Sequence, residues 1–144
     1  MRDKALGLLG LMRRAGAIEP GADRSCETAR SGKARLLVLA SDVSENARAK
    51  AENALAGKSA PLVELPFTRD ELSDALGIGD CTMAAITDMG FAEALMKQLS
   101  ALDAARYAAP AAALSQKREK MLRRKTEKGR KGQGKTNGMR RTTI

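Results

Sequence analysis

Short, mainly apolar runs alternate along the chain with longer segments in which apolar residues recur at helical spacing. Three of the runs have the length of a strand: residues 36–40, 61–65 and 83–87. The run at residues 36–40 is apolar throughout, as expected for a strand that is buried on both faces. Because each run lies between segments with helical patterning, the alternation predicts an α/β fold.

Five helices are predicted from this spacing and from the residues suited to begin and end a helix. Asp3 and Ser44 are candidate N-caps, and Thr68 with Glu71 has the spacing of a capping box. Glycines follow several of the expected C-terminal ends. The predicted helices cover residues 3–15, the segment from the turn at Pro20-Gly21 to Ser31, residues 44–56, residues 68–77, and a last segment with an apolar stripe at Phe91, Leu95, Leu99 and Leu102.

Strands that alternate with helices at this spacing favour a three-layer α/β/α sandwich, in which a small mixed, mostly parallel sheet is covered on both faces. We expect this domain to span residues 1–103. An alanine-rich linker, broken by Pro110, is expected at residues 104–114. It should lead into a basic, disordered tail at residues 115–144.

The expected tail carries most of the positive charge of the chain. Residues 115–144 contain 12 Lys and Arg against 2 Asp and Glu, whereas residues 1–114 contain 14 against 15. A dense block of like charge repels itself and becomes ordered only on a polyanion. Nucleic acid is the obvious polyanion, so we expect the tail to add sequence-independent affinity for RNA.

The composition argues against several kinds of site. There is no histidine, and Cys26 and Cys81 lie far apart, so neither structural zinc nor the usual general base is expected. Asp42 and Asp88 follow predicted strands and are candidates for acid–base chemistry, but we expect both to cap helices. The sequence therefore predicts a protein that is not an enzyme, with no catalytic residue, metal site or cofactor.

A phosphate-binding-loop pattern at residues 129–136 does not change this prediction. The segment matches G-x-x-x-x-G-K-[ST], but such a loop functions between a strand and a helix. Here a charged run precedes the match and only 8 residues follow it. We therefore interpret the match as part of the basic tail.

The sequence also bears on location and on the mode of RNA recognition. It shows no secretion signal and no apolar run of membrane-spanning length, so we expect a cytoplasmic protein without membrane contact, and a monomer. Phe67, Phe91 and Tyr107 are the only aromatic residues, which argues against an aromatic platform for stacked bases. Recognition of RNA would then depend on backbone groups, polar side chains and shape.

Several motifs occur in an order that resembles a known family. Leu-Leu-Gly-Leu-Met-Arg-Arg-Ala-Gly at residues 8–16 and Gly21 are followed by Ser-Gly-Lys-Ala-Arg-Leu at residues 31–36 and Ala-Ser-Asp-Val-Ser-Glu-Asn at residues 40–46. Glu-Leu at residues 71–72, Leu-Gly at residues 76–77 and Ala-Ile-Thr-Asp-Met-Gly-Phe-Ala at residues 85–92 continue the order. Over nearly all of residues 4–100, the chain resembles the L-seven-Ae family of large-subunit ribosomal proteins, and especially its small bacterial YlxQ-type members.

The resemblance implies an α/β/α domain that recognises kink-turns or related bent internal loops, in ribosomal RNA or another structured RNA, with the ribosome as a wider partner. In that family the contact surface combines the loop into the second helix with the loop before the strand that precedes the last helix. The RNA-binding residues implied are Gly21, Ala22, Asp23, Arg24 and Glu27 at the first place and Ile78, Gly79, Asp80 and Cys81 at the second, with Arg14 and Lys33 as surrounding counter-charge.

Some of these residues differ from those of the archaeal members, which have an Asn-Glu pair at the place of Asp23-Arg24 and a Lys at that of Glu27. An amide both donates and accepts hydrogen bonds, whereas an ionised carboxylate only accepts them. Asp23 is therefore either an RNA contact or the N-cap of the second helix. Glu27 is either an RNA contact or a solvated helix residue, while Ile78 and Cys81 either pack on an extruded nucleotide or lie half buried in the domain.

The hypothesis that follows is a structured-RNA-binding protein, associated with ribosomal RNA or the ribosome, whose tail adds non-specific affinity. The alternative is a protein-interaction module that the tail tethers to RNA or ribosomes. In that case the acidic patch at Asp70, Glu71 and Asp74 would dock a basic partner.

Overall fold

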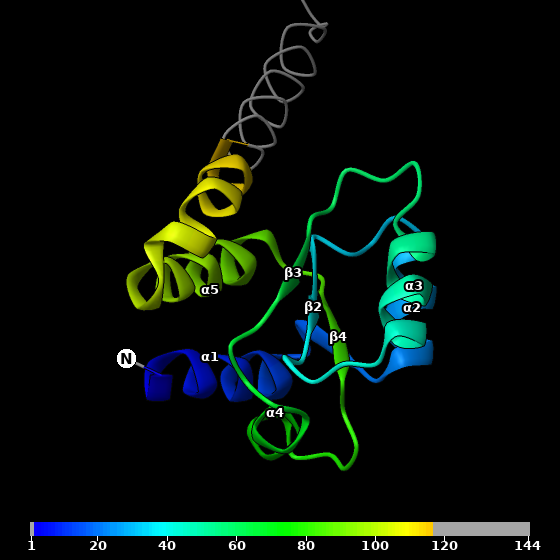
Figure 1. Ribbon diagram of the computed structural model, residues 1–144, viewed down its shortest axis with the longest axis horizontal. Coiled ribbons are helices and arrows are strands. Elements are labelled where there is room, and N and C mark those ends of the chain that lie inside the picture. Colours follow the sequence, from blue (N-terminus) through cyan, green and yellow to red (C-terminus); the bar gives the residue numbers. More distant parts are fainter. Residues whose placement is uncertain (1, 117–144) are drawn as a thin grey trace, which may run out of the picture. The chain divides into compact units, whose positions relative to one another are not determined.

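The computed structural model describes residues 2–116, which form helices around a four-stranded sheet (Figure 1). Nearly all of the predicted tail, with its phosphate-binding-loop pattern, lies outside the described residues. The helices of the domain are α1 (Arg2–Ala15), α2 (Ala22–Arg30), α3 (Glu45–Ala54), α4 (Arg69–Leu76) and α5 (Met89–Leu102), and its strands are β1 (Ile18–Pro20), β2 (Leu36–Leu39), β3 (Leu62–Glu64) and β4 (Met83–Ile86).

The strands of the sheet lie in the order β1-β4-β2-β3. The pair β2 and β3 is parallel, with Val38 opposite Val63. Strand β4 runs antiparallel to both of its neighbours and places Ala84 opposite Val38 on one side and opposite Pro20 on the other. The predicted α/β class with a small mixed sheet is confirmed, but the expectation that parallel pairs would prevail is wrong.

The direction of β4 follows from the position of α4, because the chain enters and leaves this helix at the same end of the sheet, next to the C-terminal end of β2. Before the helix, the Ser41 N–H donates to the carbonyl of Phe67 at 2.8 Å. After the helix, the Ala40 N–H donates to the carbonyl of Thr82 at 2.9 Å. Strand β4 therefore starts beside the end of β2 and runs back along it. A parallel pair needs a helix that returns along the sheet, as α3 does between β2 and β3.

Strand β1 was not predicted, because it is short and contains a proline. It has three residues and forms one edge of the sheet, beside β4. Proline lacks the N–H that a central strand needs and is tolerated at a sheet edge. The buried residues Ile18 and Pro20 face the interior on either side of half-buried Glu19.

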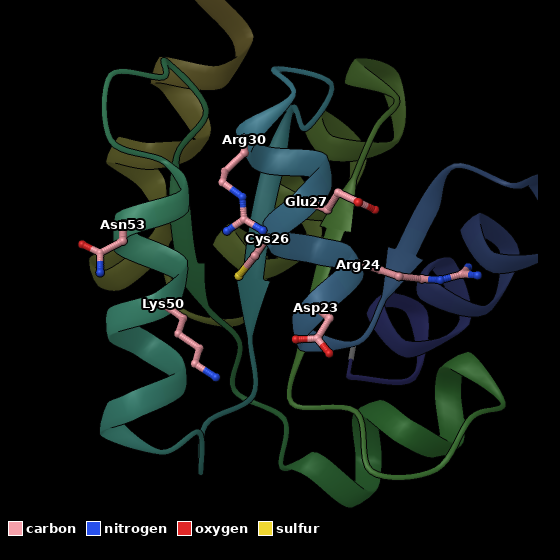
Figure 2. A pocket seen from close by; sticks show the side chains of 7 residues that line it. All are labelled: Asp23, Arg24, Cys26, Glu27, Arg30, Lys50 and Asn53. Carbon is pink, nitrogen blue, oxygen red and sulfur yellow. The ribbon is translucent and has the colours of Figure 1, made fainter.

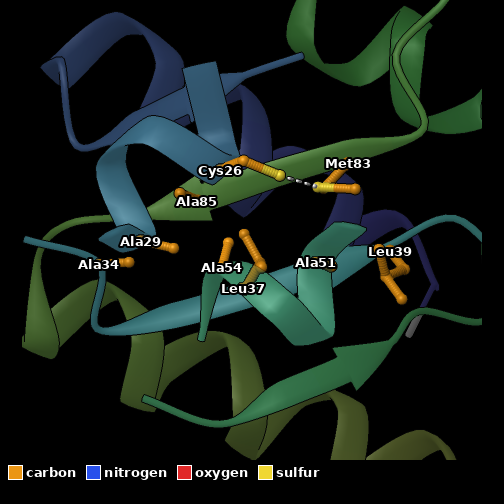
Figure 3. Close-up of a cluster of buried hydrophobic side chains, with 9 residues drawn as sticks. All are labelled: Cys26, Ala29, Ala34, Leu37, Leu39, Ala51, Ala54, Met83 and Ala85. Atoms are coloured by element: carbon orange, nitrogen blue, oxygen red, sulfur yellow. Dashed lines mark hydrogen bonds between the residues drawn. The ribbon is translucent and has the colours of Figure 1, made fainter. Parts of the chain in front are cut away.

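Helices cover both faces of the sheet, which confirms the predicted three layers. Helices α2 and α3 lie on one face, while α1 and α5 lie on the other, with α4 packed against α1 (Figure 1). Small residues dominate the layer under α2 and α3, so these helices lie close to the sheet. The buried cluster there consists of Cys26, Ala29, Ala34, Leu37, Leu39, Ala51, Ala54, Met83 and Ala85 (Figure 3).

Most of the predicted helix starts are confirmed by side-chain caps. Thr68 accepts from the Glu71 N–H, and the Glu71 carboxylate accepts from the Thr68 N–H at 3.0 Å, so the capping box is complete. Ser44 caps α3, and Asp88 caps α5 by accepting from the Phe91 N–H at 3.0 Å. The expected role of Asp88 as a cap is therefore confirmed.

Residues 104–116 are helical, whereas the sequence predicted a linker broken by Pro110 at residues 104–114. Tyr107 explains why this segment is ordered in the structure. Its side chain is 2% exposed, and its hydroxyl donates to the carbonyl of Glu64 at 2.6 Å. Arg106 adds an ion pair to the Glu64 carboxylate at 2.7 Å. A proline removes one helical hydrogen bond without ending this helix.

The contacts divide the chain into two compact units, of which the first, Met1–Ala111, contains the sheet and α1 to α5. Within residues 2–116, no helix combines the length and the apolar character needed to cross a membrane.

Candidate functional site

Gly21 forms the junction between β1 and α2 at one end of the sheet. Its backbone has φ +100° and ψ 146°, a conformation that residues other than glycine rarely adopt. Its N–H donates to the carbonyl of Met83 at 2.9 Å, which ties the junction to the start of β4. Gly21 is also the N-cap of α2 and has no side chain to accept from the first turn. The start of the helix thus presents backbone N–H groups to a ligand that accepts hydrogen bonds.

Asp23 is not the N-cap of α2, so that interpretation of the sequence is wrong. The cap position needs the positive φ of Gly21, and Asp23 follows it in the first helical turn with its side chain exposed. A carboxylate there interacts favourably with the helix dipole. Because it does not cap the helix, the Asp23 side chain can contact a ligand.

The loop at residues 78–82 lies against this junction. Cys81 is fully buried, and its N–H donates to Ser73 Oγ at 2.8 Å. Burial raises the pKa of the Cys81 thiol, and a hydrogen bond from the Gly21 backbone acts in the opposite direction. Buried Cys81 therefore connects residues 78–82 to the Gly21 junction. Because its side chain is inaccessible, a direct contact between Cys81 and a nucleotide is not possible in this structure.

The remaining residues of that loop are accessible to different degrees. Ile78 is half buried, while Gly79 and Asp80 are exposed. Asp80 has φ +57°, which is uncommon for a residue other than glycine. Its carboxylate forms an ion pair with Arg69 at 3.2 Å. The loop therefore presents both a carboxylate and a nearby guanidinium at the surface.

Arg69 is a site residue that the sequence analysis missed, because the capping box explained only Thr68 and Glu71. Its backbone N–H donates to Asp42 Oδ1 at 2.8 Å, which fixes the start of α4 at this end of the sheet. The sequence analysis expected Asp42 to cap α3. The Asp42 carboxylate instead accepts from the first turn of α4, so that expectation is wrong. The signal in the sequence was a lone basic residue before the acidic stretch of α4.

The exposed side of α2 carries the other predicted residues. Arg24 forms a long ion pair with Glu19 at 3.4 Å, with 73% of the Arg24 side chain exposed. Glu27 is also exposed. An exposed pair of this length contributes little to stability, so the Arg24 guanidinium remains available to another anion.

Two of the predicted residues lie away from this junction. Arg14 lines a groove of about 470 Å³ between α1 and α4, together with Glu71 and Asp74. Lys33 follows the C-terminal end of α2, where its N–H donates to the carbonyl of Thr28 at 3.2 Å. Since a helix of nine residues is about 13 Å long, Lys33 is separated from Gly21 by the length of α2.

The acidic patch of the alternative hypothesis borders the same loop. A groove of about 680 Å³ lies between α4 and residues 77–80. Its charged lining consists of Asp70, Asp74, Asp80 and Arg69. This surface is predominantly negative, whereas the α2 side of the junction also presents Arg24. Within residues 2–116, no group of three or more Cys, Asp or Glu side chains is arranged to hold a metal ion.

Comparisons with known proteins place the chain beside proteins described as RNA-binding or as of unknown function. No protein-family model matches the sequence. The chain is 33% identical over 92 residues to the RNA-binding protein YlxQ of Enterococcus faecium, in an alignment that covers 64% of this chain and 87% of that protein.

Two solved structures share the fold. A Bacillus halodurans protein of unknown function superposes with a TM-score of 0.62 and 25% identity, over 67% of this chain and 97% of that one. The Giardia lamblia 15.5 kDa RNA-binding protein superposes with a TM-score of 0.54 and 21% identity, over 67% of this chain and 85% of its own.

Proposed function

Because this chain belongs to the L-seven-Ae family, among its YlxQ-type members, we propose that it binds structured RNA, and kink-turn RNA in particular, through the surface where Gly21 meets residues 78–82. The observation that carries this proposal is the junction itself. Two loops that are about 57 residues apart in the chain are joined through Gly21, Met83 and Cys81. The family resemblance implied both loops as RNA contacts.

The chemistry of the junction supports this proposal. The absence of a side chain at Gly21 lets a sugar–phosphate backbone approach the start of α2 closely. The N–H groups there suit a phosphate oxygen or a base acceptor, and Asp23 suits an exocyclic amine of a base. Arg24 and Arg69 supply positive charge on either side.

We further propose that this RNA-binding takes place in the cytoplasm, on ribosomal RNA or the ribosome, and that the basic tail adds affinity without specificity. The YlxQ relative is named for RNA binding, and the charge of residues 115–144 suits a phosphate backbone. Co-sedimentation of the full chain with ribosomal subunits would test the first part of this proposal.

The test of specificity compares binding of the full chain to a kink-turn RNA and to a straight duplex of equal length at physiological salt. We expect clear preference for the kink-turn RNA. The full chain is preferable to a fragment that ends at residue 103, because such a fragment would lose buried Tyr107 and the hydrogen bond from its hydroxyl to the Glu64 carbonyl.

Gly21→Ala tests whether the junction makes the contact. A Cβ at φ +100° strains the backbone and stands between the RNA and the first turn of α2, so we expect loss of the preference for the kink-turn RNA. Gly57→Ala is the matched control, because Gly57 has φ +77°, also has open space around its Cβ position, and lies in the loop after α3. Equal RNA binding by the two variants would contradict the proposal.

The alternative function, a protein-interaction module, is favoured by the acidic groove beside α4. If that groove is the main binding surface, Gly21→Ala will leave partner binding unchanged. Asp70→Asn and Asp74→Asn will then weaken capture of a basic peptide, and the full chain will bind both RNAs equally.

A further inference from the structure

A groove of about 550 Å³ runs between α2 and α3, on the face of the sheet that these helices cover (Figure 2). It begins next to the candidate RNA surface, because residues of the first turn of α2 line one end of it. Neither the family resemblance nor the motifs drew attention to this groove. Its lining residues are Asp23, Arg24, Cys26, Glu27, Arg30, Lys50 and Asn53.

Two cations from different helices face this groove. Arg30 extends from the last turn of α2 toward Cys26, and Lys50 extends from the middle of α3 toward the end of the groove where Asp23 lies (Figure 2). The side chains of Arg24, Glu27 and Asn53 point away from the groove (Figure 2). Burial raises the pKa of the Cys26 thiol. The nearby charges of Arg30 and Lys50 act against this rise, whereas Asp23 adds to it. The interior of the groove therefore holds two positive charges and one negative charge.

Neither cation has a carboxylate partner among the ion pairs of residues 2–116. Four arginines of the same domain do have one: Arg24 with Glu19, Arg69 with Asp80, and both Arg48 and Arg106 with Glu64. Arg30 and Lys50 instead line the same groove from two different helices, where like charges repel. An anion bound between them would relieve this repulsion.

We propose that the groove between α2 and α3 is a second RNA-binding site, which holds a phosphate of the sugar–phosphate backbone through Arg30 and Lys50. The Arg30 guanidinium offers a fork of N–H donors, and the Lys50 ammonium offers a compact positive charge. Asp23 repels a phosphate at the near end of the groove, so the phosphate lies toward Arg30.

Continuity with the candidate surface selects RNA as the occupant. Asp23 and Arg24 belong both to the start of α2 and to the lining of the groove. Arg30 follows Arg24 by six residues, or about 9 Å along the helix. A strand that passes the start of α2 can therefore continue along this helix into the groove. This inference rests on the proposed function and extends the contact from the kink to a flanking strand.

The test uses Arg30→Gln and Lys50→Gln in the full chain, with binding to a kink-turn RNA measured at several salt concentrations. Each variant should weaken binding and reduce the slope of log K against log salt by about 0.7 to 0.9, the effect of one phosphate contact. Lys97→Gln is the matched control, because Lys97 is an exposed lysine of α5, on the opposite face of the sheet. Thermal unfolding of all three should match that of the parent chain.

Neutral methylphosphonate linkages, placed one at a time along the RNA, identify the contacted phosphate. At that position the substitution weakens binding by the parent chain but has little further effect on Lys50→Gln. If the parent chain prefers the kink-turn RNA while both groove variants behave like Lys97→Gln, this inference is wrong and the proposed function stands. If the parent chain shows no preference for the kink-turn RNA over the straight duplex, the proposed function itself is wrong, and this inference falls with it.

Discussion

Asp80 combines a left-handed backbone conformation with an ion pair to Arg69, and both side chains are largely exposed. An exposed pair of this kind contributes about 1 kcal/mol or less to stability. A phosphate that approaches residues 78–82 can therefore take the place of the Asp80 carboxylate on Arg69. In the free protein, Asp80 partly neutralises a cation that the bound RNA would use.

Asp80→Asn should consequently tighten RNA binding by several-fold, measured by titration with a kink-turn RNA. Asparagine tolerates positive φ, so the loop keeps its conformation while the competing charge is lost. In the background of Arg69→Gln the gain should disappear. Asp74→Asn, which removes a negative charge from the same groove, is the control for general repulsion. An equal gain from Asp74→Asn would show that competition for Arg69 is not the cause.

At the scale of elements, the first part of the helical segment after α5, residues 104–111, belongs to the domain through Tyr107. The ring is buried against the domain, and the hydroxyl donates to the carbonyl of Glu64 at the end of β3. The guanidinium of Arg106 lies 5.1 Å from the centre of the same ring and also pairs with the Glu64 carboxylate. Strand β3 is an edge strand, so these contacts hold a segment over the exposed side of the sheet.

Tyr107→Phe should lower the free energy of unfolding by about 1 kcal/mol, because the partly buried carbonyl of Glu64 loses its hydrogen bond while the ring keeps its packing. Urea denaturation followed by circular dichroism measures this change. Arg106→Gln, which removes the exposed ion pair, should have a smaller effect. Unchanged stability of Tyr107→Phe would mean that the hydrogen bond to Glu64 contributes nothing to the stability of the domain.

At the scale of the whole molecule, charge is unevenly divided between the domain and the tail. Residues 117–144 contain all 12 of the basic residues counted in residues 115–144, while the rest of the chain is close to neutral. A nearly neutral domain gains RNA affinity through placed contacts, whereas a dense basic segment gains it through release of counterions. The two parts should therefore respond differently to salt.

Deletion of residues 117–144 should flatten the salt dependence of RNA binding and keep the preference for the kink-turn RNA. If about six of the basic residues contact phosphates on single strands, the slope of log K against log salt falls by about 4. Ending the chain at residue 116 retains Tyr107, which is buried in the first unit. An unchanged slope would contradict the proposed role of the tail.

Local signals account for the features that the sequence alone determined. The capping box at Thr68 and Glu71, the caps Ser44 and Asp88, and the apolar run within β2 were all predicted correctly. Each depends on residues within a few positions of one another, so no knowledge of the fold was needed. The charge of the tail is likewise a property of composition.

Features that depend on contacts between segments far apart in the sequence were decided only by the tertiary structure. Both ends of α4 lie at the same end of the sheet, so β4 runs antiparallel to β2. Strand β4 also pairs with β1, although β1 contains Pro20. The family resemblance implied both loops of the junction, but only the fold shows that Cys81 joins them from beneath and that Lys33 lies at the far end of α2. The groove that Arg30 and Lys50 line has no local pattern in the sequence, because its two sides come from different helices that the fold places in contact.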